Sequence, residues 1–447
     1  MKHPAYILIL LLAFAQAALA VDPPEDGVYP TRINPALGIG NQSVAPALLK
    51  NLGRRGGANK GANLFVGMGR SGLPAVGNPK MLVLLIDFEE YPARAADTPE
   101  AIAAGIFGAG GEFPYESLSN FYKRSSFGKL NIQGDVLGWY HAGKRADVPN
   151  TMAGRQALIK QALESYKDKD FAQYDNNGDG VVDYFAVIWT GPLGEWATFW
   201  WGVAPKFTDK TFTLNGKTFY SYSWQGIVQK WDDPASQFKV STLIHETGHA
   251  LGLPDYYDYK PGVGPDGGLG YVDMMDNAKY DHNCFSKMLL GWTDPKVVTL
   301  SGDFNLRPAA DSGECVMIMP KGKEMNPFSE FFLVENRRKT GNDGDKYFPV
   351  GGLLVWHVDA RLNPAGNNFL YNNQETEHKL LKFMEADGLE ELEKGTNRSV
   401  SAADFYAKDR ALGTATVPSS KLYDGNETGI SLVSRGGDYD VAFSVVR

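Results

Sequence analysis

The sequence predicts an α+β protein with two folded domains, and three observations lead to this prediction. The chain has 447 residues, which exceeds the roughly 250 to 300 residues at which a single hydrophobic core stops growing. Residues 79–298 combine apolar strand-like runs with helical periodicity, which predicts a mixed sheet with helices packed against it. Residues 299–447 change to short apolar strands between glycine and asparagine turns, a pattern typical of a β-sandwich-like domain.

The composition is that of an ordinary globular protein. Apolar residues make up 43% of the chain, aromatic residues 12% and charged residues 21%, so neither a disordered nor a collagen-like chain is expected. The formal net charge is −8. This charge argues against nucleic acid as a partner, because phosphate binding requires a basic face.

The N-terminus has the features of a secretory signal peptide. Within residues 1–20, Lys2 precedes an apolar run over residues 6–12, and the segment ends in the small-residue sequence Ala-Leu-Ala. We expect cleavage after Ala20, and therefore secretion. Residues 21–78 are rich in Gly, Pro, Asn and Ala and show no sustained period, which predicts a propeptide or flexible leader.

The mature chain is expected to make no stable membrane insertion. No segment after the signal peptide approaches the roughly 20 apolar residues that a membrane helix needs. Cys284 and Cys315 are the only cysteines. In an oxidising compartment they could form a disulfide or stay free, and the sequence leaves both alternatives open.

The first predicted domain opens with an uninterrupted apolar strand at residues 81–88, which is typical of a buried central strand. Residues 152–166 place apolar side chains at helical spacing. A turn-rich loop then leads into a second apolar strand at residues 184–189 (YFAVIW). Residues 211–224 predict a β-hairpin, because Asn215-Gly216 supplies the positive φ angles of a type I′ turn. The strands predicted for the second domain are residues 330–337, 351–359, 379–387 and, as a pair, 429–446.

A helix predicted over residues 236–252 carries the sequence HETGH. His245 and His249 lie one helical turn apart, so both imidazoles can bind a single zinc ion. Glu246 lies beside the metal position. Zinc lowers the pKa of a bound water toward about 7, so Glu246 can take its proton as a general base and produce a nucleophile for a peptide carbonyl.

A catalytic zinc site usually has a third protein ligand. The sequence contains no glutamate between Glu246 and Glu314, which argues against a glutamate ligand on a later helix. In the other common scheme, a glycine ends the helix and a ligand six residues after the second histidine reaches the metal. Gly252 and Asp255 occupy these positions. The competing candidates for the third ligand are His282 and Asp258. Separately, Met274 and Met275 fit a methionine turn beneath such a site.

Several motifs, taken in order, resemble the immune inhibitor A family of secreted bacterial zinc metallopeptidases. They are LVLLIDF, SNFYKRSSFGKLNIQGDVLGWY (residues 119–140), HETGHALGLPDYYD, SKMLLGW (residues 286–292), FFLVENRRKTG and GGLLVWHVD. The resemblance covers about residues 80–447. It implies a metzincin-like zinc protease domain followed by a β-rich domain, made as a secreted zymogen. It also implies zinc ligands at His245, His249 and Asp255 and a catalytic base at Glu246, with Asp255 where typical metzincins have a third histidine.

A second metal site is predicted at residues 175–183, whose oxygen-bearing side chains have the spacing of an EF-hand calcium loop with its turn glycine. The last position of the motif is Ala186 in place of the usual glutamate, and a strand follows instead of a helix. A structural calcium site is favoured over an Asx-turn loop without an ion. The predicted calcium ligands are Asp175, Asn177, Asp179, Val181 and Asp183.

His357 and Asp359 alternate on one predicted strand and therefore face the same side. A structural hydrogen bond is favoured for this pair over a metal cluster.

The sequence thus predicts a secreted, monomeric zinc endopeptidase that acts on polypeptides, whose substrate lies along an edge strand near Asn215-Gly216 or residues 184–189. The alternative is a calcium-stabilised surface-binding or adhesive protein that retains the protease fold. The presence of Glu246 favours the enzyme, because a binding protein does not need the base.

Overall fold

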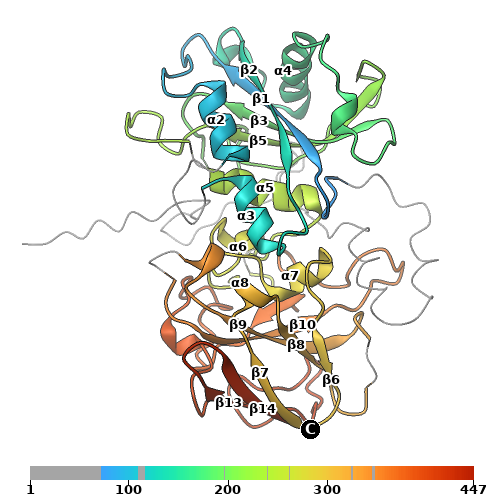
Figure 1. The fold of residues 1–447 in the computed structure, drawn as a ribbon, viewed down its shortest axis with the longest axis vertical. Helices are drawn as coiled ribbons and strands as arrows, with labels where there is room; N and C mark the ends of the chain where they lie inside the picture. Colours follow the sequence, from blue (N-terminus) through green and yellow to red (C-terminus); the bar gives the residue numbers. More distant parts are fainter. Residues whose placement is uncertain are drawn as a thin grey trace, which may run out of the picture.

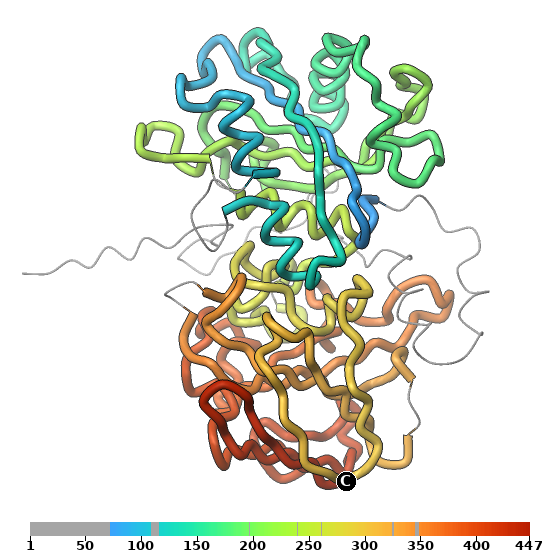
Figure 2. Tube along the Cα trace, viewed as in Figure 1, coloured from blue at the N-terminus to red at the C-terminus, as the bar shows by residue number. Residues whose placement is uncertain are grey.

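The computed structural model describes residues 72–447, except 109–115, 196, 239, 261, 324–325 and 345–347. The predicted signal peptide and most of the predicted leader lie outside the described residues. Figure 1 shows the described chain as two lobes, an N-terminal lobe coloured blue to green and a C-terminal lobe coloured orange to red. Figure 2 shows the C-terminus at the far end of the second lobe. The mixed helix and strand content confirms the α+β class.

The first sheet is mostly parallel and has the strand order β2-β1-β3-β5-β4. Only β4 runs antiparallel to its neighbour β5. Strand β3 lies between β1 and β5, and all its residues are buried because apolar side chains pack on both faces of the sheet. The expectation of a substrate edge along residues 184–189 is therefore wrong, since a central strand has both sides paired. The strands are β1 (Lys80–Asp87), β2 (Gln133–His141), β3 (Val181–Trp189), β4 (Thr213–Leu214) and β5 (Lys217–Gly226).

Helices cover both faces of this sheet, as Figure 1 shows. On one face α4 packs through Leu158, Ile159 and Leu163 against the apolar side chains of β1 and β3. On the other face lie α2, α3 and α5. The helices are α2 (Pro99–Phe107), α3 (Leu118–Ser125), α4 (Met152–Glu164), α5 (Val240–Leu251), α6 (Met274–Asn277), α7 (Cys284–Leu289) and α8 (Ala309–Ser312), with single 3-10 turns at Arg145–Asp147, Ala172–Tyr174, Gly341–Asp343 and Ala402–Asp404.

The C-terminal lobe contains two further sheets, with strand orders β11-β10-β9-β8-β6 and β12-β13-β14-β7. Their facing sides share one apolar core that includes Phe332, Leu432 and Phe443, so the C-terminal lobe is built mainly from β-strands. The strands are β6 (Lys296–Val298), β7 (Gly302–Leu306), β8 (Cys315–Ile318), β9 (Glu330–Arg337), β10 (Gly352–Asp359), β11 (Leu381–Phe383), β12 (Ala411–Leu412), β13 (Ser431–Gly436) and β14 (Val441–Val446).

One hydrophobic core runs through both lobes. It joins Met81 of β1 and Ile244 of α5 to Trp356 of β10. Leu73 belongs to the same core, and the Trp292 indole donates a hydrogen bond to the carbonyl of Ala75 (2.7 Å). Residues 72–78 of the predicted leader therefore pack onto the folded protein, and the division at residue 298 does not separate two cores.

Cys284 in α7 and Cys315 in β8 are both buried and have free thiols in this structure. Of the two alternatives open from the sequence, the structure therefore contains the unpaired one. Among the described residues, no helix has the length and apolar character needed to cross a membrane.

Candidate metal centre

Helix α5 presents the HETGH sequence from the middle of the molecule. The Tyr122 hydroxyl of α3 donates to the carbonyl of Ile244 (2.6 Å) and fixes the buried side of the helix. A Cβ at Gly248 would lie 2.4 Å from the sulfur of Met275. The absence of a side chain at Gly248 therefore lets Met275 of α6 pack directly against the helix.

The helix ends as predicted at Gly252, whose φ angle is +104°. The N–H of Gly252 donates to the carbonyl of His249 (2.9 Å), and the N–H of Leu253 donates to the carbonyl of Gly248 (3.0 Å). This pair of bonds is a Schellman motif, which needs a left-handed residue after the last helical turn. The reversal directs Asp255 back toward the helix.

Asp255 meets both histidines at a single oxygen atom. Its Oδ1 lies 3.0 Å from Nε2 of His245 and 3.4 Å from Nε2 of His249. One potential ligand atom from each of the three residues lies within 4.8 Å of the other two. The structure therefore brings together all three predicted zinc ligands.

Backbone carbonyls fix the orientation of both imidazoles. His245 Nδ1 lies 2.8 Å from the carbonyl oxygen of Met274, and His249 Nδ1 lies 2.9 Å from that of Leu253. Because a carbonyl oxygen can only accept, each Nδ1 carries the proton, and each neutral ring has its lone pair on Nε2. The two lone pairs point toward the atom of Asp255 that a shared metal ion would also contact.

The carboxylate of Asp255 is oriented by two residues that the sequence analysis did not select. The Tyr259 hydroxyl donates to Oδ2, which leaves Oδ1 without a hydrogen bond although it is buried. The Gln374 amide donates to the backbone carbonyl of Asp255 (2.8 Å). A buried, unpaired carboxylate oxygen facing two imidazole lone pairs is a donor set that fits zinc, which takes three protein ligands of this kind in catalytic sites.

The electrostatics of the centre follow from burial and from the three charges that meet there. Burial opposes protonation of His245, but the Asp255 carboxylate outweighs it and raises the pKa of His245 to about 9. The pKa of His249 is raised for the same reason. Burial also favours a neutral Asp255, yet the two imidazoles hold its pKa below the usual range. The cluster thus attracts positive charge, which a divalent cation can supply in place of protons.

Neither competing ligand joins this cluster. The ammonium of Lys379 lies 2.7 Å from Oδ2 of Asp258, so that carboxylate already has a cationic partner. His282 is fully buried, and burial lowers its pKa to about 3. Its ring packs against the aromatic rings of Phe121, Tyr122 and Trp292.

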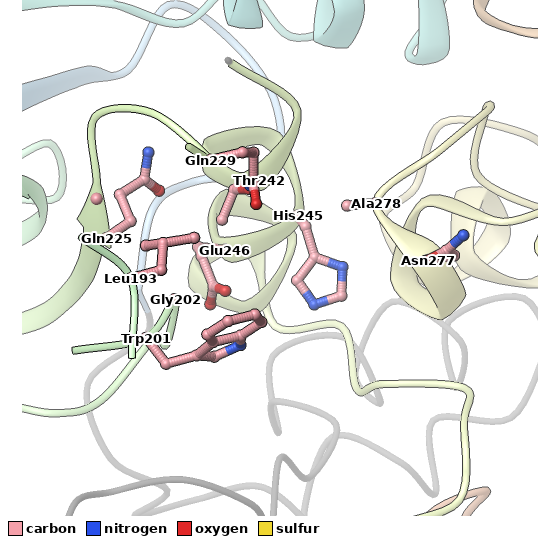
Figure 3. A pocket seen from close by; sticks show the side chains of 11 residues that line it. Leu193, Trp201, Gly202, Gln225, Gln229, Thr242, His245, Glu246, Asn277 and Ala278 are labelled. Atoms are coloured by element: carbon pink, nitrogen blue, oxygen red, sulfur yellow. The ribbon is translucent and has the colours of Figure 1, made fainter. Parts of the chain in front are cut away.

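Glu246 lines a pocket next to the centre. Figure 3 shows the side chains of Glu246 and His245 projecting from α5, with Trp201 close to the Glu246 carboxylate. A Cβ at Gly202 would lie 3.5 Å from Oε1 of Glu246, so this glycine leaves space beside the carboxylate. Gln225 also lines the pocket and is buried, and neither polar atom of its amide has a hydrogen-bond partner among the described residues. The remaining lining residues are Leu193, Gly226, Gln229, Thr242, Asn277 and Ala278.

Residues 202–206 form the edge of the first sheet next to Glu246. Val203 both donates to and accepts from Trp224 of β5 (3.0 and 2.8 Å) in an antiparallel bridge. Because hydrogen-bonding direction alternates along such a segment, the backbone groups of Gly202 point away from β5. Asn215-Gly216 has the predicted positive φ angles, but it precedes β5, whereas the pocket lies at the other end of that strand.

The predicted calcium loop is compact and satisfies many of its own polar groups. Both oxygens of Asp175 accept loop N–H groups, and the Lys217 ammonium lies 2.7 Å from Oδ2. Asn177 accepts from the N–H of Asp179 (2.9 Å) and donates to Asp183 (3.3 Å). Among the described residues, these carboxylates do not gather into a three-ligand cluster. Calcium binding at this loop stays a prediction.

His357 and Asp359 have different partners. His357 Nε2 lies 2.8 Å from Oε1 of Glu330, and the Asp359 carboxylate accepts from Arg361 (2.8 Å). They are not part of a three-residue metal-ligand cluster among the described residues, and each has its own polar partner.

The chain is similar to known metalloproteases. No protein-family model matches it. It is 30% identical over 182 residues to Immune inhibitor A of Bacillus thuringiensis subsp. alesti, a match that covers 32% of this chain and 26% of that protein. It is 26% identical over 187 residues to the pre-pro-metalloprotease PrtV of two Vibrio cholerae serotype O1 strains, M66-2 and ATCC 39315, covering 34% of this chain and 20% of PrtV. The chain thus spans far less than two thirds of either relative. The predicted resemblance is confirmed as a distant one over about a third of this chain, and its predicted extent over residues 80–447 is not shown.

Proposed function

We propose that the chain is a secreted zinc-dependent endopeptidase that hydrolyses peptide bonds of extracellular proteins. Zinc is bound by His245, His249 and Asp255, and Glu246 is the general base. The observation that carries the proposal is the convergence of two imidazole Nε2 atoms on Asp255 Oδ1 directly beside the Glu246 pocket. The distant similarity to a protein named as a metalloprotease supports the same class of enzyme.

Glu246 has the position that proton transfer requires. A zinc ion in this set would supply Lewis acidity toward a water molecule and a peptide carbonyl. The Glu246 carboxylate lines the pocket next to His245. It can therefore accept a proton from the attacking water and return it to the leaving amine.

The edge at residues 202–206 supports an extended polypeptide as substrate. An edge segment whose backbone groups point outward can pair with an added strand, and Gly202 adjoins Glu246. The buried amide of Gln225 offers a donor and an acceptor to a substrate side chain that enters the pocket. The glycine-ended helix and the methionine turn beneath it support a metzincin-like catalytic domain.

The experiment that tests the proposal separates zinc binding from hydrolysis. In Glu246→Ala, zinc content per chain should equal that of the wild type, because Glu246 is not a ligand, whereas casein hydrolysis should fall by roughly 10²- to 10⁴-fold. Glu164→Ala, which removes an exposed glutamate of α4, should retain full activity. Wild-type turnover by Glu246→Ala would contradict the mechanism. A zinc-loaded wild type that hydrolyses no protein would favour the adhesive alternative.

A further inference from the structure

A second carboxylate cluster lies in the C-terminal lobe, outside the predicted zinc and calcium sites. Glu385, Asp387 and Asp404 each place one carboxylate oxygen within 4.8 Å of the other two. Glu385 and Asp404 are each 1% exposed, and Asp387 is half-buried. Three carboxylates this close repel one another unless a positive charge lies between them.

No lysine, arginine or histidine of the described chain forms an ion pair with these three carboxylates. The nearby ammonium of Lys382 pairs with Glu390 and Glu393 instead, and that of Lys394 pairs with Glu390. The protein therefore leaves the negative charge of the cluster uncompensated.

Asp404 provides a second, independent observation. Its Oδ2 accepts the N–H of Ser401 (2.6 Å) in a capping box, but its Oδ1 is buried without any hydrogen-bond partner. An ionised oxygen with no partner is costly in a buried site unless a cation contacts it. One oxygen of Asp404 thus orients the side chain through a hydrogen bond, and the other oxygen has no hydrogen-bond partner.

The Glu385 carboxylate is also oriented by backbone hydrogen bonds. It accepts N–H groups from Glu391 (2.9 Å) and Leu392 (3.1 Å). Oε1 accepts a second N–H group, from Glu393 (3.4 Å), whereas Oε2 accepts only that of Glu391. Because an ionised carboxylate oxygen has about two lone-pair sites, Oε2 can still bind a metal ion. Asp387 accepts from the N–H of Leu389 (3.0 Å) and likewise keeps acceptor capacity.

We propose that Glu385, Asp387 and Asp404 bind one calcium ion. The donors are all oxygen atoms, which suit hard cations and do not suit zinc. They come from an irregular loop and a 3-10 turn, and calcium accepts such flexible geometry with 6 to 8 oxygen ligands, whereas magnesium requires a near-ideal octahedron. Backbone carbonyls and water complete the shell.

The loop that Glu385 organises contacts the segment between the third zinc ligand and the methionine turn. Gly267 donates to the carbonyl of Glu393 (2.7 Å), and a Cβ at Gly267 would lie only 1.7 Å from the carbonyl oxygen of Leu392. Asp276 then accepts the N–H groups of Leu269 and Tyr271. Calcium therefore stabilises the segment that follows Asp255 in the metal centre. This consequence rests on the proposed function, whereas the proposal that calcium binds here does not rest on it.

Calcium content measured on the full chain tests the site directly. Wild type, Asp387→Asn, Asp404→Asn and the matched charge control Glu427→Gln are equilibrated with zinc and a defined concentration of free calcium, and calcium per chain is measured by atomic emission. Glu427 is an exposed acid of the same lobe. We expect one calcium fewer per chain in Asp387→Asn and Asp404→Asn than in the control. Equal calcium content in all four proteins would overturn the proposal.

Thermal unfolding gives a second readout that a purely structural role would not reproduce. In calcium-free buffer with zinc, Asp387→Asn should melt at a higher temperature than wild type, because it removes like-charge repulsion. Added calcium should raise the melting temperature of Asp387→Asn less than that of Glu427→Gln. Equal calcium-dependent increases in these two variants would contradict the site. Neither readout needs proteolysis. The calcium site can therefore be refuted while the proposed function stands, and the proposed function can be refuted while the calcium site stands.

Discussion

The hydroxyl of Tyr259 offers a test of the candidate metal centre, because it contacts the proposed ligand Asp255 and is not itself a proposed ligand. Tyr259→Phe removes the hydrogen bond to Asp255 Oδ2 and changes no ligand. Asp255 and Tyr259 are each 3% exposed, so water cannot readily replace the lost donor. We therefore expect weaker zinc binding in a folded protein.

The size of this effect follows from the burial of the carboxylate. Leaving a buried acceptor without its donor costs about 1–3 kcal/mol. At about 1.4 kcal/mol for each factor of ten, the zinc affinity should fall by about 5- to 150-fold. This range agrees with the roughly 10- to 100-fold loss that is typical when a hydrogen-bond partner of a metal ligand is removed.

Zinc affinity can be measured by competition with a chromophoric chelator of known affinity. Tyr257→Phe is the matched control, because it removes the same hydroxyl group two residues away. The Tyr257 ring packs on that of Tyr259, with centroids 5.3 Å apart. We expect this control to bind zinc as the wild type does. A Tyr259→Phe protein with wild-type zinc affinity would refute the assignment of Asp255 as a ligand held by this hydroxyl.

Three further outcomes are expected. Asp255→Ala should lose stoichiometric zinc on dialysis while His282→Ala retains it, because His282 lies among aromatic rings; the opposite result would move the site to His282. Asp179→Ala should abolish the part of the calcium-dependent rise in melting temperature that comes from the 175–183 loop, and an unchanged rise would remove calcium from that loop. Gly267→Ala should lower the free energy of unfolding by about 1–3 kcal/mol because its Cβ meets a rigid carbonyl, whereas Gly143→Ala, with open space around it, should change it by no more than about 1 kcal/mol.

The parts of the centre that were predictable from the sequence lie within one short stretch. The positions of His245 and His249 follow from helical spacing, and the direction of Asp255 follows from the left-handed turn at Gly252. Each of these features depends on neighbours no more than a few residues away. Local geometry was therefore sufficient to predict that these three side chains lie together, as they do in the structure.

The supporting residues could not be predicted in the same way, because they depend on tertiary contacts. Gln374 reaches Asp255 across 119 positions of sequence, and no spacing rule connects them. Tyr259 is part of the same motif, but its contact with Asp255 depends on the path of the chain after the helix. The edge at Val203 was also missed, since it consists of isolated bridges without the alternation of a strand.

The two candidate calcium sites also differ in whether they could be predicted from local sequence spacing. The 175–183 loop has the right spacing, yet Lys217, supplied by the following hairpin, pairs with Asp175. The cluster of Glu385, Asp387 and Asp404 has no recognisable spacing, yet it gathers three carboxylates without a cation. Oxygen spacing in a sequence reports potential ligands, whereas the position of competing lysines is a tertiary property.

The C-terminal lobe contributes directly to the candidate metal centre. It supplies the Gln374 amide that holds the backbone of Asp255, and Trp356 of β10 lies in the same core as Ile244 of α5. A chain that ended at residue 298 would expose the apolar face that these residues cover and would lose that amide. The two halves that differ in sequence pattern therefore share one core, and the C-terminal half contacts the backbone of the proposed ligand Asp255.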